Sequence, residues 1–182
     1  MAKKVYDVTD LGPGDGGKGG VVHATSVKTR AHTVIKMGGF NGNHGVCTSG
    51  GEQFAFSQWG CGTFEGTRTF ITKRFIVSTV GLINEARALR YRYGIHDPFG
   101  LLDIDERALC ATSYHGISSR LKELALGNNP RGTIGTGAGE AYRYSLRVPE
   151  LSIFARDLSC ANLRDRLWAV REQITRDLAP IL

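Results

Sequence analysis

Residues 10–20 read Asp-Leu-Gly-Pro-Gly-Asp-Gly-Gly-Lys-Gly-Gly, between a short strand-like segment at 4–8 and a modestly apolar stretch at 21–24. This order predicts a strand, a glycine-rich loop and a helix, which together commonly form an anion-binding loop. Glycines let backbone N–H groups approach an anion, and the start of the next helix adds partial positive charge. The segment therefore favours an α/β domain built around a phosphate-binding loop.

The loop differs from a standard P-loop at one decisive position. Gly12, Gly17 and Lys18 fit the first part of the Walker A pattern, but Gly19 stands where that pattern has the Ser or Thr that holds Mg²⁺. Asp15 lies inside the loop, three residues before the lysine. A carboxylate is useful there when it holds a metal or takes a proton. The alternative is a glycine-rich turn with a solvated Asp and Lys.

Length and composition narrow the possible classes of protein. A chain of 182 residues predicts a single domain over 1–182 with one substantial core. The net charge is +6, but Lys and Arg are scattered, so no nucleic-acid-binding surface is indicated. We expect a cytoplasmic protein, because no apolar run approaches a membrane span and no signal peptide is recognisable. The cysteines lack CxxC spacing and are expected to be reduced thiols.

Two further loops carry polar groups suited to a ligand. A strand expected at 33–37 leads into the segment 38–45, where glycines and side-chain amides surround His44. A surface histidine is the alternative there. The segment 131–140 places Thr133 and Thr136 beside an arginine, which suits a phosphate, although a plain loop fits the pattern equally well.

The remaining pattern alternates strands with helices. Further strands are expected at 53–57, 68–72, 75–78, 101–105 and 108–112. Helices are expected at 82–93, 114–126 and 162–178, the last with an apolar stripe for core or subunit packing and Asn162 as N-cap. We therefore predict a three-layer, P-loop-like α/β domain with a mixed, mostly parallel sheet. The loops 12–20, 38–45 and 132–140 should meet at one edge of that sheet.

Four segments in this order resemble the N-terminal half of the adenylosuccinate synthetase family, from about Val5 to Leu158. Residues 14–20 resemble the family's Gly-Asp-Glu-Gly-Lys-Gly-Lys, and residues 38–45 resemble Gly-Gly-x-Asn-Ala-Gly-His-Thr. Ser113-Tyr114-His115 resembles Pro-Tyr-His. Residues 134–142 resemble a shortened form of Ile-Gly-Thr-Thr-Gly-Arg-Gly-Ile-Gly-Pro-Ala-Tyr.

The resemblance implies a two-step ligation. In the family, GTP phosphorylates the 6-oxygen of IMP, and aspartate then displaces that phosphate to give adenylosuccinate. The resemblance implies that Asp15 takes the N1 proton of the purine and that His44 donates to the transferring phosphoryl group. It also implies Mg²⁺ as cofactor, with Asp15 and the carbonyl of Asn43 as oxygen ligands.

The same resemblance assigns residues to nucleotide binding. Lys18 and the loop backbone would hold the GTP phosphates, and the side chains of Asn41 and Thr136 would touch IMP. Arg147, or Arg143, would correspond to the family's arginine that reaches across a dimer. The implied nucleotide-binding set is Gly14, Gly17, Lys18, Gly19, Asn41, Thr136 and Arg147.

Departures from the family pattern leave several functions open. Gly16 and Gly20 replace a glutamate and a lysine, Asn43 and Gly45 flank the histidine differently, and the third loop is shorter. The guanine-specific and aspartate-binding elements of the family's second half are not recognisable. We therefore expect a ligase that acts on IMP or a related purine nucleotide and needs a second polypeptide or homo-oligomer. The alternative is a non-catalytic module that binds a purine nucleotide or a protein. A generic P-loop NTPase fits less well, because a Walker B acid is missing.

Overall fold

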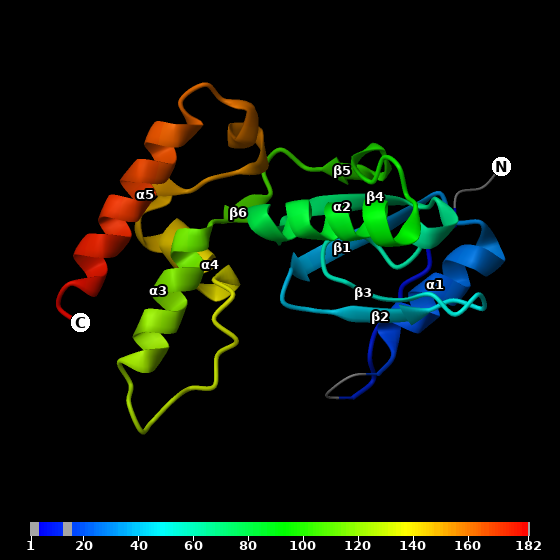
Figure 1. The fold of residues 1–182 in the computed structure, drawn as a ribbon, viewed down its shortest axis with the longest axis horizontal. Coiled ribbons are helices and arrows are strands. Elements are labelled where there is room, and N and C mark those ends of the chain that lie inside the picture. Colours follow the sequence, from blue (N-terminus) through cyan, green and yellow to red (C-terminus); the bar gives the residue numbers. More distant parts are fainter. Residues whose placement is uncertain (1–3, 13–15, 182) are drawn as a thin grey trace.

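The computed structural model of the protein describes residues 4–12 and 16–181, and β4 (Arg68–Ser78) is the central strand of its main sheet (Figure 1). β1 (Thr33–Gly39) pairs with β4 along one edge, in parallel. β5 (Leu102–Ile104) and β6 (Leu109–Ala111) pair in parallel with the first and last parts of β4. β2 (His44–Cys47) and β3 (Gln53–Phe56) form a separate antiparallel hairpin.

Helices lie beside the sheet and at one end of the molecule. Figure 1 shows α1 (Lys18–Thr29) beside the β2–β3 hairpin and α2 (Thr79–Tyr93) along β4. α3 (Ser113–Leu124), α4 (Ala138–Arg147) and α5 (Leu163–Leu178) gather beyond β6. Short 3₁₀ turns connect these elements at Thr63–Glu65, Phe99–Leu101, Pro149–Leu151 and Ala155–Ser159. The predicted α/β class with a mostly parallel sheet is confirmed.

β4 joins two segments that the sequence predicts as separate strands, 68–72 and 75–78. Its register against β1 shifts: Lys36 lies opposite Ile71, whereas Gly38 lies opposite Phe75. Two extra residues of β4 are accommodated at this irregularity, and the hydroxyl of Thr72 donates to the Lys36 carbonyl there at 3.0 Å. The prediction of two strands is therefore wrong, because the bulge interrupts the alternation without ending the strand.

Most of the other predicted elements are confirmed with shifted ends. α2 begins three residues earlier than expected, because the Ser78 hydroxyl accepts from the Gly81 N–H at 3.0 Å and caps the helix. It ends as predicted at Gly94, whose φ of 69° closes the helix in the left-handed region. Asn162 precedes α5 as predicted, but its side chain makes no capping bond.

The strand predicted at 4–8 is wrong, because residues 4–12 form neither helix nor strand. Val5 and Tyr6 expose 86% and 54% of their surface, so the apolar residues of this segment are not buried in a sheet. A strand needs a neighbour for its N–H and C=O groups, and among the described residues none pairs with this segment. Its apolar residues alone do not form a strand.

α5 packs its apolar stripe inward. Val170, Ile174 and Leu178 are buried in the hydrophobic core, and α5 contacts α3. The prediction that this stripe serves packing is confirmed. The four cysteines are free thiols, as expected. No described helix is both long and apolar enough to cross a membrane.

Candidate functional site

α1 begins inside the first glycine loop. Gly17 precedes the helix with a φ of 74°, a conformation that favours glycine, and Lys18 is the first helical residue. The first turn contains no acidic residue, so the partial positive charge at this helix start is not offset within the turn. The Lys18 ammonium group forms an ion pair with Asp10, which precedes the loop. The helix start and Lys18 together suit an anion.

The central part of the first loop lies outside the described residues. Gly14 and Asp15 belong to it, so the predicted catalytic and metal-binding roles of Asp15 stay predictions. Gly16 is described, and a Cβ there would lie 2.2 Å from an oxygen of Asp10. The loop therefore passes close to the Asp10 carboxylate, and a larger residue at this position would displace that side chain.

The second loop touches the start of α1. A Cβ at Gly19 would lie 2.4 Å from the carbonyl oxygen of Gly45 and 2.9 Å from the carbonyl carbon of His44. Only a glycine lets the helix backbone approach β2 this closely. The first turn of α1 therefore contacts the backbone of His44, the predicted catalytic residue, whose side chain is half-buried.

The third loop reaches the second across most of the sequence. The Thr136 hydroxyl donates to Oδ1 of Asn41 at 2.5 Å, although 95 residues separate the two. Gly137 then packs so tightly against α3 that a Cβ would lie 2.5 Å from the Gly116 nitrogen. Figure 1 shows the segment before α4 running beside the end of β1. The structure thus joins the second loop to the other two by separate contacts: Gly19 lies against His44 and Gly45, and Thr136 bonds to Asn41.

Asn43 is held by a residue that the sequence does not indicate. The Ser57 hydroxyl, at the end of β3, donates to Oδ1 of Asn43 at 2.5 Å. Because the side-chain oxygen of Asn43 accepts this hydrogen bond, the oxygen that remains for the predicted metal site is the backbone carbonyl of Asn43. No sequence pattern indicated this contact, because a serine at a strand end is ordinarily a surface residue.

The two arginines predicted as candidates for nucleotide binding lie on α4 and have protein partners. Arg147 forms an ion pair with Asp177 of α5, and its guanidinium lies 4.9 Å from the centre of the Tyr144 ring. Arg143 lies 3.7 Å from the Glu140 carboxylate. Their predicted contact with nucleotide stays a prediction, and each arginine would have to loosen an ion pair to make it.

The described residues contain no group of three His, Cys, Asp or Glu side chains arranged to hold a metal. Mg²⁺ does not need such a cage, since it commonly binds through one or two protein oxygens, phosphates and water. The Asn43 carbonyl is a hard oxygen donor beside the helix that suits phosphate. The described part of the site therefore fits a phosphate-bound Mg²⁺ in the chemistry of its donors.

His115, in the Ser-Tyr-His segment, is buried at the start of α3. Its Nδ1 accepts from the Thr112 N–H at 3.1 Å, which satisfies a backbone group at the helix start. Burial lowers the pKa of His115 to about 4, although nearby Glu140 opposes that shift. His115 is therefore neutral at pH 7 and has a structural role. It stabilises the start of α3, against which Gly137 of the third loop packs.

Acid should destabilise the fold through His115. The folded pKa of about 4 lies below the unfolded value of 6.5, so between these values the unfolded chain binds more protons. The free energy of unfolding should fall as the pH drops from 6.5 to 4, by about 3 kcal/mol in total. Urea unfolding at pH 7, 5.5 and 4 measures this change. His115→Gln should show a shallower pH dependence, and an unchanged slope would contradict the assignment.

Comparison with known proteins agrees with the fold. The adenylosuccinate synthetase family profile matches residues 8–177. Adenylosuccinate synthetases of Actinobacillus succinogenes and Histophilus somni are 32% and 31% identical over 160 residues, covering 85% of this chain and 36% of each relative. The chain thus spans about a third of the length of these curated relatives.

Two solved structures share the fold. The fully ligated adenylosuccinate synthetase of Plasmodium falciparum matches with a TM-score of 0.75 at 15% identity, over 90% of this chain and 37% of that one. The succinoaminodeoxyadenylate synthetase PurZ of cyanophage S-2L, bound to dGMP and to dATP as an energy donor, matches with a TM-score of 0.58 at 16% identity, over 88% and 45%. Since the family profile covers nearly all of the sequence, the chain belongs to the adenylosuccinate synthetase family.

Proposed function

We propose that this chain forms the phosphoryl-transfer part of a GTP-dependent purine nucleotide ligase, which joins aspartate to IMP or a related purine nucleotide. The observation that carries the proposal is the meeting of three loops. Gly19 at the start of α1 packs on Gly45, and Thr136 bonds to Asn41, so the second loop contacts both the first and the third. Such a set can hold phosphates and a purine together.

The proposed chemistry gives Asp15 and His44 separate tasks. The Asp15 carboxylate takes the N1 proton of the purine, which makes its O6 nucleophilic. O6 attacks the γ-phosphorus of GTP and the bond to GDP breaks, while His44 donates to the transferring phosphoryl oxygens. The amine of aspartate then attacks C6, loses a proton, and phosphate leaves.

Lys18, the loop backbone and the α1 start would hold the phosphates. Mg²⁺, bound by Asp15, the Asn43 carbonyl and the phosphates, would neutralise phosphate charge. Lys18 now pairs with Asp10, so binding a phosphate requires the ammonium group to share or exchange that partner. We place this activity in the cytoplasm, where purine nucleotides are abundant.

The complete reaction also needs groups for guanine and aspartate. The chain spans about a third of its relatives' length, so we propose that a protein partner or a second copy contributes to the site. One observation favours a second candidate function, a non-catalytic purine-nucleotide-binding module. Because Lys18 pairs with Asp10, its charge is offset and stabilises a transferring phosphoryl group less, whereas the backbone N–H groups at the α1 start can still bind a nucleotide phosphate.

Calorimetry of the purified chain tests the proposal. The chain with Mg²⁺ is titrated with IMP, dGMP, GTP and ATP, and micromolar binding of at least one is expected. Asp15→Asn should keep most of this binding but abolish turnover in the completed complex, whereas His44→Ala should weaken both. Asp165→Asn, on the exposed side of α5, is the matched control. Turnover by Asp15→Asn would favour the second candidate role for this chain, and absence of binding to all four would overturn both.

A further inference from the structure

Two buried charged side chains hold the turn at 57–59, just after β3. The Glu85 carboxylate, on α2, accepts the N–H groups of Ser57, Gln58 and Trp59 at 3.2, 2.9 and 3.0 Å. The Lys36 ammonium group, on β1, donates to the carbonyls of Ser57 and Trp59 at 2.5 and 3.1 Å. Both charged residues are more than 90% buried. A turn outside regular secondary structure thus has its backbone groups satisfied by two side chains.

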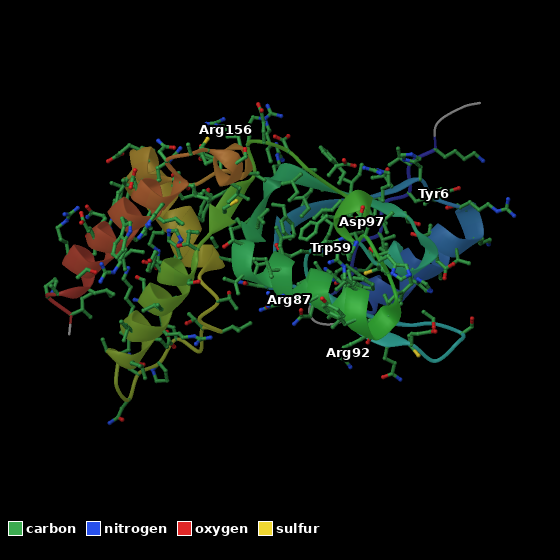
Figure 2. The ribbon with its side chains drawn as sticks, turned by 45° about the horizontal axis from the view of Figure 1, so that its top comes forward. Tyr6, Trp59, Arg87, Arg92, Asp97 and Arg156 are labelled. Carbon is green, nitrogen blue, oxygen red and sulfur yellow. The ribbon has the colours of Figure 1, made fainter. Side chains whose placement is uncertain are left out.

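The turn is also tied to the rest of the sheet. The Gln58 amide group bonds to both the N–H and the carbonyl of Ser78, each at 2.9 Å. The Trp59 indole donates to the Pro98 carbonyl at 2.9 Å, and Figure 2 shows Trp59 within the sheet-containing part of the molecule. The turn is therefore a rigid part of the core rather than a surface loop.

Ser57 connects this rigid turn to the site. Its backbone is held by Lys36 and Glu85, whereas its hydroxyl points outward and donates to Asn43 at 2.5 Å. Asn43 is exposed and lies in a segment between β1 and β2 that has no regular structure. The Ser57 hydroxyl links the Asn43 side chain in this segment to the buried turn at 57–59.

We propose that Ser57, anchored by Lys36 and Glu85, is a positioning residue that fixes Asn43 and thereby the backbone leading into His44. The inference deepens the proposed function, because it says how the chain holds the carbonyl and the imidazole where a phosphate-bound metal and a phosphoryl group would lie. Ser57 does not itself touch the reacting atoms. Its effect passes through Asn43.

NMR relaxation of the full chain without ligand tests the positioning directly. The order parameter of the Asn43 amide is expected to be about 0.85 in the wild type and about 0.6 or less in Ser57→Ala. Ser57→Thr keeps a hydroxyl and should retain the wild-type value. Thr48→Ala is the matched control, because Thr48 bonds to Glu52 at the far end of the same hairpin and should leave Asn43 unchanged.

Calorimetry with Mg²⁺ and the nucleotide that binds best is the second measurement. Ser57→Ala should weaken binding about fivefold, the factor that corresponds to one hydrogen bond of ordinary strength, and Ser57→Thr should restore it. An unchanged order parameter in Ser57→Ala would overturn the inference, even if nucleotide binds. A lowered order parameter in a chain that binds no purine nucleotide would support the positioning and refute the proposed function.

Discussion

Glu85→Ala is expected to lower the free energy of unfolding by about 3–5 kcal/mol, because it leaves the buried Lys36 charge without the nearby carboxylate that offsets it. That loss is a large part of the roughly 5–15 kcal/mol that stabilises an ordinary domain. Burial raises the pKa of Glu85, whereas three backbone N–H groups and Lys36 lower it. Burial lowers the pKa of Lys36 to about 8, against the opposing effect of Glu85. Lys36 is therefore still mostly charged at pH 7, and its charge needs the carboxylate.

The backbone adds to this cost. Without Glu85, the N–H groups of residues 57–59 lose their acceptor inside the core, and an unsatisfied buried donor is expensive. Urea unfolding at pH 7 measures the loss. Glu123→Ala is the matched control, because the Glu123 carboxylate also accepts backbone N–H groups, from Gly132 and Thr133, but in contact with solvent. The control should lose far less stability.

A double-mutant cycle separates the pair from the backbone effect. Lys36→Met alone should also destabilise the fold, since it leaves the Glu85 carboxylate buried without its cation. The variant with both Lys36→Met and Glu85→Ala should lose less than the sum of the two single losses, because neither charge remains. Strictly additive losses would show that the two side chains do not stabilise each other.

The sequence predicted those parts of the fold that depend on local pattern. Helix ends at Gly94, the apolar stripe of α5 and the glycine loops are local signals, and the structure contains them. The rule that ligand-binding loops follow parallel strands applies only to the second loop, which follows β1, because no strand precedes the first loop in the described part of the chain and α3 precedes the third. The individual bond between Thr136 and Asn41 was not predictable, because nothing in the sequence specifies a pairing 95 residues apart.

β1 shows why the sequence does not predict which side chains of a strand are buried. The strand expected at 33–37 is present, but its apolar Ile35 and Met37 expose 59% and 68% of their surface, and Lys36 between them is buried. The lysine faces inward because the turn at 57–59 offers it two carbonyls and Glu85 offers it a charge. These partners come from two other elements, so hydropathy alone assigns this lysine to the surface.

The failed strand at 4–8 has a related cause. Its apolar residues read as a strand, yet a strand depends on a neighbour, and sequence alone does not supply the neighbour. Val5 is largely exposed in the structure. Local pattern therefore predicts elements whose sequence signals are local. It does not predict whether a segment that needs a tertiary partner will form a strand.

Gly19→Ala is expected to weaken nucleotide binding about a hundredfold, because losing two hydrogen bonds from the helix start to a charged phosphate, at about 1.5 kcal/mol each, gives a factor of that size. The added Cβ would lie 2.4 Å from the Gly45 carbonyl oxygen and 3.0 Å from the Gly45 nitrogen. These are backbone atoms, which cannot rotate away as a side-chain end can. α1 and β2 must separate, and the helix start then moves away from His44. The same overpacking should lower the free energy of unfolding by about 1–3 kcal/mol.

Gly20→Ala is the matched control for this prediction. Gly20 is the next residue of α1 and is exposed, and a Cβ there would meet nothing within 4 Å. Alanine is the better helix former by about 1 kcal/mol, so this variant should be slightly more stable and bind nucleotide as the wild type does. Thermal unfolding and calorimetry on both variants measure the contrast. If Gly19→Ala binds as tightly as Gly20→Ala, the close approach of α1 to the second loop is not what assembles the site.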